Sequence, residues 1–300
     1  MKTRILLFLI SVLAAAPAAA AINVLACEPE WGALTREIAG DRAKVYEAST
    51  ALQDVHHIQA RPSLMAAARR ADIVVCTGAE LEVGWLPVLT SESGNGRIQP
   101  GAPGYFEAAR QVSLLEIPTQ LDRSRGDVHP QGNPHIQTDP RNIARVAAAL
   151  ADRLAQVDPP NAAWYRERHR SFDQRWQQAI ARWQREAAPL KGLKVVVHHQ
   201  AFTYLFAWLG IDAVGALEPL PGVDPTIAHM SELLEAQKTN PAKLVVRASY
   251  NDPRAAEWFA GRAGIPAIML PFSVGGDDAS KDLFSWYDDM LSILLKAAGK

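Results

Sequence analysis

Residues 193–209 read LKVVVHHQAFTYLFAWL, and this stretch decides the fold class. Its first five residues, 193–197, form the short apolar and β-branched run that is typical of a buried strand. The apolar run 201–209 has the length of a short helix and follows after only three residues. A buried strand leading into a helix is the repeating unit of parallel α/β sheets.

The same alternation continues on both sides of this stretch. The other predicted strands are 22–26, 44–47, 73–76, 244–246 and 267–270, and the other predicted helices are 29–39, 62–70, 141–157, 226–238, 253–263 and 281–298. Asp224 is the expected N-cap of helix 226–238. Strands that alternate with helices of this length predict parallel α/β units.

A long helix is predicted over residues 161–188. Its apolar residues Phe172, Trp176, Ala179 and Trp183 are spaced by four, three and four, which places them on one helix face. About 28 residues correspond to about 42 Å of helix. This length favours a helix that joins two lobes, and an ordinary helix packed along one domain is the alternative. The expected division is a leader at 1–21, an N-terminal α/β lobe at 22–158, a linking helix at 159–189 and a C-terminal α/β lobe at 190–300.

The first residues have the pattern of a secretory signal peptide. Lys2 and Arg4 precede the apolar run 5–15, and small residues occupy 18–21. No later run approaches the eighteen apolar residues of a membrane span, so we expect an exported, periplasmic protein. The chain has 31 Lys and Arg against 32 Asp and Glu, and losing Lys2 and Arg4 brings the net charge to about −3. This balance argues against a nucleic-acid or anionic-membrane partner.

Two cysteines, Cys27 and Cys76, follow or end the predicted strands 22–26 and 73–76. In an exported protein such a pair favours a disulfide, and two buried, unpaired thiols are the alternative. Residues 24–27 also faintly resemble a lipoprotein cleavage box with Cys27 as the lipid anchor. The polar Asn23 and the bulky Leu25 argue against that interpretation.

Six of the eight histidines lie in three loop-like places. They are His56 and His57, His129 and His135, and His198 and His199. His199 follows the end of a predicted parallel strand, where open α/β sheets bind their ligands. Three converging imidazoles would suit zinc. Because their spacing is not local, the spacing alone favours ordinary surface histidines over a metal site.

Ordered motifs connect these histidines to a known family. The motifs are Asp54-Val55-His56 with Pro62-Ser63, the segment 71–87, Asn133-Pro134-His135 with Asp139-Pro140, His199 with Ala201-Phe202 and Tyr204, and Glu218-Pro219 with Gly222 and Asp224-Pro225-Thr226. Over nearly the whole mature length, the chain resembles the periplasmic metal-binding receptors of zinc and manganese ABC importers. Val55 stands where the family has a proline.

The resemblance implies both a fold and a function. It implies two α/β lobes joined by a rigid helix, with a metal in the cleft between them. It implies His56, His135 and His199 as metal ligands and Zn(II) as the transported ion. The implied partner is the membrane permease of an ABC metal importer. We expect a monomer without enzymatic activity.

Two departures from the family pattern concern the fourth ligand. Leu270 stands where many relatives carry an aspartate ligand, and Arg247 lies near a position where some carry glutamate. Water is therefore the first expectation, and Asp277 or Asp278 the second. Losing a carboxylate favours zinc over manganese, which prefers oxygen ligands.

The remaining loop histidines are given smaller roles. The loop before His135 is shorter and less histidine-rich than in many zinc receptors of the family, and it contains His129. We expect His129 to be a loop residue without a specific role, and transient collection of metal is the alternative. His57 and His198 adjoin proposed ligands and should point away from the metal, although His57 could support a ligand by a hydrogen bond.

Two other functions fit a three-histidine site. A zinc hydrolase or lyase would use a metal-bound water, but the chain has no HExxH motif. A receptor for haem or a metal chelate would need a pocket for a macrocycle, whereas three convergent histidines suit a bare ion better.

Overall fold

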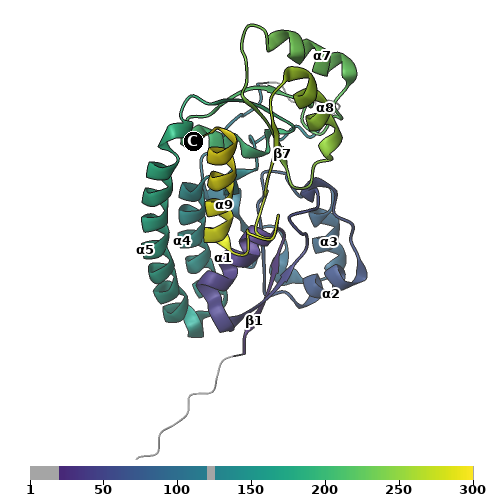
Figure 1. The fold of residues 1–300 in the computed structure, drawn as a ribbon. Coiled ribbons are helices and arrows are strands. Elements are labelled where there is room, and N and C mark those ends of the chain that lie inside the picture. The colour runs from purple at the N-terminus through teal and green to yellow at the C-terminus, as the bar shows by residue number, and fades with distance from the viewer. Residues whose placement is uncertain (1–19, 120–125, 300) are drawn as a thin grey trace, which may run out of the picture.

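The computed structural model describes residues 20–119 and 126–299, so the predicted leader lies almost entirely outside the described residues. Two four-stranded parallel sheets form the molecule (Figure 1). The first has the order β2-β1-β3-β4, with β1 Ile22–Ala26, β2 Ala43–Glu47, β3 Ile73–Cys76 and β4 Tyr105–Glu107. The second has the order β6-β5-β7-β8, with β5 Lys194–Val197, β6 Asp212–Ala216, β7 Leu244–Ala248 and β8 Ala267–Leu270. The predicted fold class is confirmed.

Helices cover both faces of the first sheet. The helices of the described residues are α1 Pro29–Ala39, α2 Pro62–Arg70, α3 Leu86–Ser93, α4 Pro140–Val157, α5 Ala162–Glu186, α6 Thr203–Leu209, α7 Ile227–Ala236, α8 Pro253–Ala263 and α9 Leu283–Ala297. Val24 and Ala26 of β1 pack in the cluster that contains α1 and α4, and Leu25 packs with α2 and α3 on the opposite face. This alternation follows from the two-residue period of a strand.

The long helix is α5, and its predicted packing face is confirmed. Its 25 residues extend about 37 Å, and Phe172, Trp176, Ala179 and Trp183 are all buried. It packs against α1 and α4 of the N-terminal lobe and against α9 near the C-terminus (Figure 1). The residue numbers at which the lobes begin and end stay a prediction.

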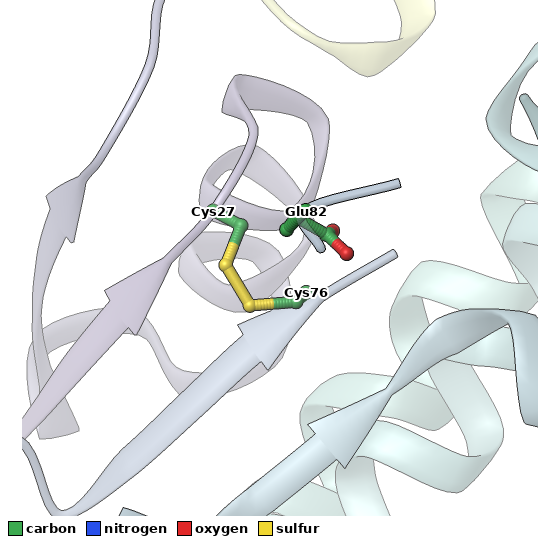
Figure 2. Close-up of side chains that lie close together, drawn as sticks. All are labelled: Cys27, Cys76 and Glu82. Carbon is green, nitrogen blue, oxygen red and sulfur yellow. A yellow bond between two sulfur atoms is a disulfide. The ribbon is translucent and has the colours of Figure 1, made fainter. Parts of the chain in front are cut away.

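Cys27 and Cys76 form a disulfide, as predicted (Figure 2). Because β1 and β3 are parallel neighbours, the ends of the two strands bring the sulfurs together. Cys27 is fully buried, so its sulfur is not available as a lipid anchor. Glu82 lies close to the two sulfurs. The three side chains do not form a thiolate metal site, since the sulfurs are bonded to each other.

Three elements were not expected from the sequence, and one cap differs. The missed elements are β4, β6 and α3. Helix α7 is capped by the hydroxyl of Thr226, which accepts the backbone N–H of His229, so the expected Asp224 cap is wrong. Within the described ranges, no helix is both long and apolar enough to span a bilayer.

Candidate metal centre

Local turns hold the three predicted ligands. His56 lies in a short 3-10 turn, where its N–H is bound by the side chain of Asp54 at 3.0 Å. The N–H of His135 is bound in the same way by Asn133 Oδ1 at 2.9 Å. His199 lies just beyond the carboxyl end of β5, in the position expected for a ligand-binding residue of an α/β sheet.

The imidazoles converge from both lobes. The rings of His56 and His135 have centroids 5.8 Å apart, those of His56 and His199 are 6.1 Å apart, and those of His135 and His199 are 5.2 Å apart. Nε2 of His135 lies 3.1 Å from Nε2 of His199. The structure therefore brings together all three histidines that the sequence singled out.

A fourth histidine, His129, joins this cluster. Its Nε2 lies 3.2 Å from Nε2 of His56, and the two ring centroids are 5.3 Å apart. The sequence led us to expect a loop residue without a specific role, and the structure places this loop residue against the ring of His56. Local sequence gave no signal for it, because the contact joins residues 73 positions apart.

Two carboxylates orient the rings from behind. Asp54 Oδ1 lies 2.7 Å from Nδ1 of His56, and Glu218 Oε2 lies 2.7 Å from Nδ1 of His199. A carboxylate only accepts hydrogen bonds, so each ring donates through Nδ1. This tautomer directs the Nε2 lone pair of each neutral ring into the cluster, the arrangement found behind metal-bound histidines.

Burial sets the protonation of the other rings. It lowers the pKa of His135 to well below the usual value, and the neighbouring histidines lower it further. Burial, followed by the charges of His56 and His199, lowers the pKa of His129 to about 3. Both rings are therefore neutral near pH 7. Nδ1 of His135 is buried and has no hydrogen-bond partner among the described residues.

His56 behaves differently because of its carboxylate. Burial disfavours its charged form, but the hydrogen bond and the charge of Asp54 outweigh burial and raise the pKa of His56 above 6.5. Asp54 responds in the opposite direction. Burial works against its ionisation, but the hydrogen bond and the charge of His56 lower its pKa to about 2. A proton on His56 can bridge its Nε2 to that of His129.

The two predicted carboxylate alternatives do not line the histidine cavities. A cavity of about 240 Å³ is lined by His129, His135 and His199, and one of about 550 Å³ by His56 and His199. Neither lining contains Asp277 or Asp278. Asp277 instead accepts the backbone N–H groups of Ala279 and Ser280.

His57 and His198, which adjoin the proposed ligands His56 and His199, both line the larger of the two cavities. His57 is exposed, and His198 is buried with its Nε2 3.9 Å from Oε1 of Glu218. Both line the 550 Å³ cavity rather than facing the Nε2 contacts of the cluster. Leu270 is fully buried and packs in the main core.

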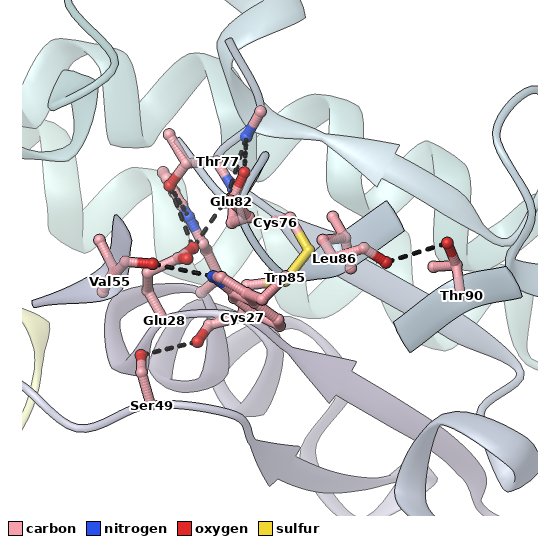
Figure 3. Close-up of a disulfide and its surroundings, with 12 residues drawn as sticks. Cys27, Glu28, Ser49, Val55, Cys76, Thr77, Glu82, Trp85, Leu86 and Thr90 are labelled. Atoms are coloured by element: carbon pink, nitrogen blue, oxygen red, sulfur yellow. Dashed lines mark hydrogen bonds between the residues drawn. A yellow bond between two sulfur atoms is a disulfide. The ribbon is translucent and has the colours of Figure 1, made fainter. Parts of the chain in front are cut away.

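A buried carboxyl pair supports the loop beside the cluster (Figure 3). Oε1 of Glu82 accepts the N–H of Thr77 at 2.7 Å, and its Oε2 accepts that of Gly78 at 3.0 Å. These bonds hold Gly78, Ala79 and Glu80 at positive φ, which is costly for the two residues that are not glycine. Burial raises the pKa of Glu82 to about 7 and raises that of Glu28 well above its usual value, where the neighbouring charges of Glu82 and Glu30 add to the effect of burial.

Two parallel α/β lobes with a histidine cluster contributed by both define a class of two-lobed receptors. The model of the family described as zinc-uptake complex component A, periplasmic (ZnuA), matches residues 24–297. The chain belongs to this family.

Curated relatives are distant in sequence. The chain is 23% identical over 247 residues to the zinc-binding lipoprotein AdcA of Streptococcus pneumoniae. The aligned residues cover 79% of this chain and 47% of AdcA. It thus spans about half the length of the AdcA proteins that it matches. It is 24% identical to the manganese ABC transporter substrate-binding lipoprotein PsaA of S. pneumoniae, over 88% of this chain and 84% of PsaA.

Solved structures share the fold. A crystal structure of ZnuA aligns with a TM-score of 0.76 at 19% identity, covering 93% of this chain and 98% of that chain. A periplasmic metal-binding protein from Candidatus Liberibacter asiaticus aligns with a TM-score of 0.75 at 16% identity, covering 92% and 99%. At this identity the likeness establishes the two-lobed fold.

Proposed function

We propose that this protein is a periplasmic receptor that captures Zn(II) between its lobes and delivers it to the membrane permease of an ABC importer. His56, His135 and His199 are the ligands. The receptor acts as a monomer and catalyses no reaction. Family membership and the names of the zinc-binding relatives support this assignment.

One observation carries the metal assignment, namely the separation of the Nε2 atoms. Two nitrogens bound to one tetrahedral zinc at about 2.0–2.1 Å are about 3.3 Å apart. The 3.1 Å between His135 and His199 is close to this separation. Opposed lone pairs at that distance need a proton or a cation between them, so a divalent ion would relieve their repulsion.

The donor set favours zinc over manganese. The atoms that face the centre are imidazole nitrogens, which suit zinc, whereas manganese prefers carboxylate oxygens. Asp54 and Glu218 are engaged with Nδ1 atoms behind the ligands. The same engagement speaks against a hydrolase, because neither carboxylate is free to serve as a general base.

The contact distances also speak against a macrocycle. A haem or a large chelate would need the rings to stand apart, with the cofactor between them. The Nε2 contact of 3.1 Å leaves room for a single ion instead.

The test is the metal content of the demetallated mature protein after incubation with zinc. We expect one zinc per chain, and we expect none in the triple variant His56→Ala, His135→Ala, His199→Ala. The matched control is His57→Ala, which removes an exposed neighbour and should retain the zinc. Zinc retained by the triple variant would move the site elsewhere. No zinc in the unmodified protein would overturn the proposal.

A further inference from the structure

We propose that His129 is the fourth ligand of this centre, so that four imidazoles surround the transported ion and no water is bound to it. This inference rests on the proposed function. It replaces the water and the aspartates considered from the sequence. The geometric support is the 3.2 Å separation of the Nε2 atoms of His129 and His56, which matches the spacing of two nitrogens on one zinc, about 3.3 Å.

The ring spacing agrees with a shared ion within each of two pairs. Rings that point at one tetrahedral zinc have centroids about 5 Å apart, given nitrogen–zinc distances of about 2.0–2.1 Å. The centroids of His129 and His56 are 5.3 Å apart, and those of His135 and His199 are 5.2 Å apart. Among the described residues no three of the four rings have donor nitrogens within 4.8 Å of one another, so an ion held by all four draws the two pairs together as it binds.

The backbone of Ala79 lies beside the ring of His129. Burial and the charges of His56 and His199 lower the pKa of His129, and the backbone of Ala79 raises that pKa by less. Ala79 lies in the loop of positive φ that Glu82 fastens through the N–H groups of Thr77 and Gly78. His129 thus has a rigid partner in the N-terminal lobe.

His129 is carried by residues 126–133, which we call the strap. The strap is attached at both ends. The N–H of Asp127 donates to the carbonyl of Pro221 at 2.7 Å, and the N–H of Asn133 donates to the carbonyl of Leu115 at 2.8 Å. Between them, Gly132 N–H closes a turn on the carbonyl of His129 at 3.0 Å.

Two glycines make the first attachment possible. A Cβ on Gly126 would lie 2.2 Å from the carbonyl oxygen of Pro221, and one on Gly222 would lie 2.2 Å from the Asp127 carboxylate. The Gly222 N–H also donates to Glu218, the carboxylate that orients His199. The strap is therefore tied to the segment that positions a ligand of the opposite lobe.

Four protein ligands have a chemical consequence. Catalytic zinc sites keep one position open for water, whereas closed sites hold the metal without reactivity. A fourth imidazole gives a closed site, which fits a receptor. It also gives selectivity against manganese, because none of the four donor atoms is an oxygen.

The test compares His129→Ala with His57→Ala in zinc affinity, measured by competition with a chromogenic chelator. Removing a residue that hydrogen-bonds a metal ligand lowers metal affinity by roughly 10–100-fold. We expect the zinc affinity of His129→Ala to fall by more than this, and that of His57→Ala to change little. A second variant, His129→Gln, guards against a packing defect, and thermal unfolding of the metal-free proteins reports whether each is folded.

A spectroscopic readout separates ligation from packing. Co(II) in place of zinc should give the visible spectrum of a tetrahedral all-nitrogen site in the unmodified protein and a changed spectrum in both His129 variants. Unchanged affinity and an unchanged Co(II) spectrum in the variants would overturn the role of His129 and leave the receptor intact. An unmodified protein that binds no zinc would instead refute the receptor itself.

Discussion

Glu218 joins the metal-ligand candidate His199 to the turn at Gly222, and all three residues line the same cavity. Its Oε2 lies 2.7 Å from Nδ1 of His199 and accepts the backbone N–H of Gly222 at 2.8 Å. One carboxylate oxygen therefore fixes both the orientation of the His199 ring and the loop to which the strap is attached.

Replacing Glu218 should weaken metal binding without removing a ligand. In Glu218→Gln the charge that supports the Nδ1–H of His199 is lost, and we expect zinc affinity to fall by about 10–100-fold. The measurement is chelator competition at pH 7.5. Glu235→Gln, on the exposed side of α7, is the matched control. Equal affinities for the two variants would contradict the supporting role of Glu218.

Zinc affinity should depend on pH through His56. Zinc needs a neutral imidazole, so bound protons compete with it. The pKa of His56 is raised above 6.5, so affinity should begin to fall as pH drops through that raised pKa. Below it we expect about a tenfold loss per pH unit for one competing proton. His129 and His135 are already neutral in this range and should add nothing to the initial slope.

An ordinary histidine would place this loss below its usual pKa of about 6.5, and the Asp54 contact moves it upward. Titration calorimetry in two buffers of different ionisation enthalpy would count the released proton. Asp54→Asn removes the charge that raises the pKa and should move the onset to lower pH. An onset that is the same in both proteins would exclude His56 as the titrating group.

The disulfide should stabilise the N-terminal lobe. Cys27 and Cys76 are separated by 49 residues, and closing a loop of that size is worth about 2–4 kcal/mol. The double variant Cys27→Ala, Cys76→Ala should lose about this much in the free energy of unfolding by urea. Reductant should bring the unmodified protein to the value of the variant and leave the variant unaffected. If reductant leaves the unmodified protein unchanged, the bond makes no contribution.

Tyr204 should matter through its hydroxyl. The group accepts the N–H of Leu115 at 2.9 Å and donates to the carbonyl of Asn133 at 2.6 Å, so it links the last residue of the strap to Leu115. In Tyr204→Phe the carbonyl of the buried Asn133 loses its bond, and a buried group left unpaired costs about 1–3 kcal/mol. We expect lower thermal stability and weaker zinc binding. Tyr46→Phe is the control, because its hydroxyl contacts Ser63 at the surface.

The two missed strands, β4 and β6, each lie at the end of a sheet, although the end strands β2 and β8 were predicted. β1 and β3 lie in the middle of the first sheet and have the predicted bounds, because each is a short, mostly apolar run with buried side chains on both faces. β6 contains an exposed Asp212 and a glycine, and β4 has only three residues. A strand at the end of a sheet pairs with another strand on one side only, and its side chains are more exposed to solvent. The sequence of such a strand therefore has a weaker hydrophobic pattern.

The three expected histidines, which lie near one another in the structure, each adjoin a local motif, and their role as ligands stays a prediction. Asp54 and Asn133 lie two residues before His56 and His135 and bind their backbone N–H groups, so the motif itself forms the turn. His129 has no such local partner. Its place depends on Pro221 and Ala79, which are far away in the chain. Long-range packing of this kind leaves no spacing to recognise.

The position of α9 has a consequence for how the chain folds. This last helix extends from the second sheet and packs against α1 and α5 beside the first one (Figure 1). Its Tyr287 donates a hydrogen bond to the carbonyl of Gln137, and the core cluster that contains it runs through both lobes. Neither half of the chain can complete its own core without the other. The two sheets therefore form one cooperative unit, and cutting the polypeptide between them would leave two incomplete fragments rather than two independent domains.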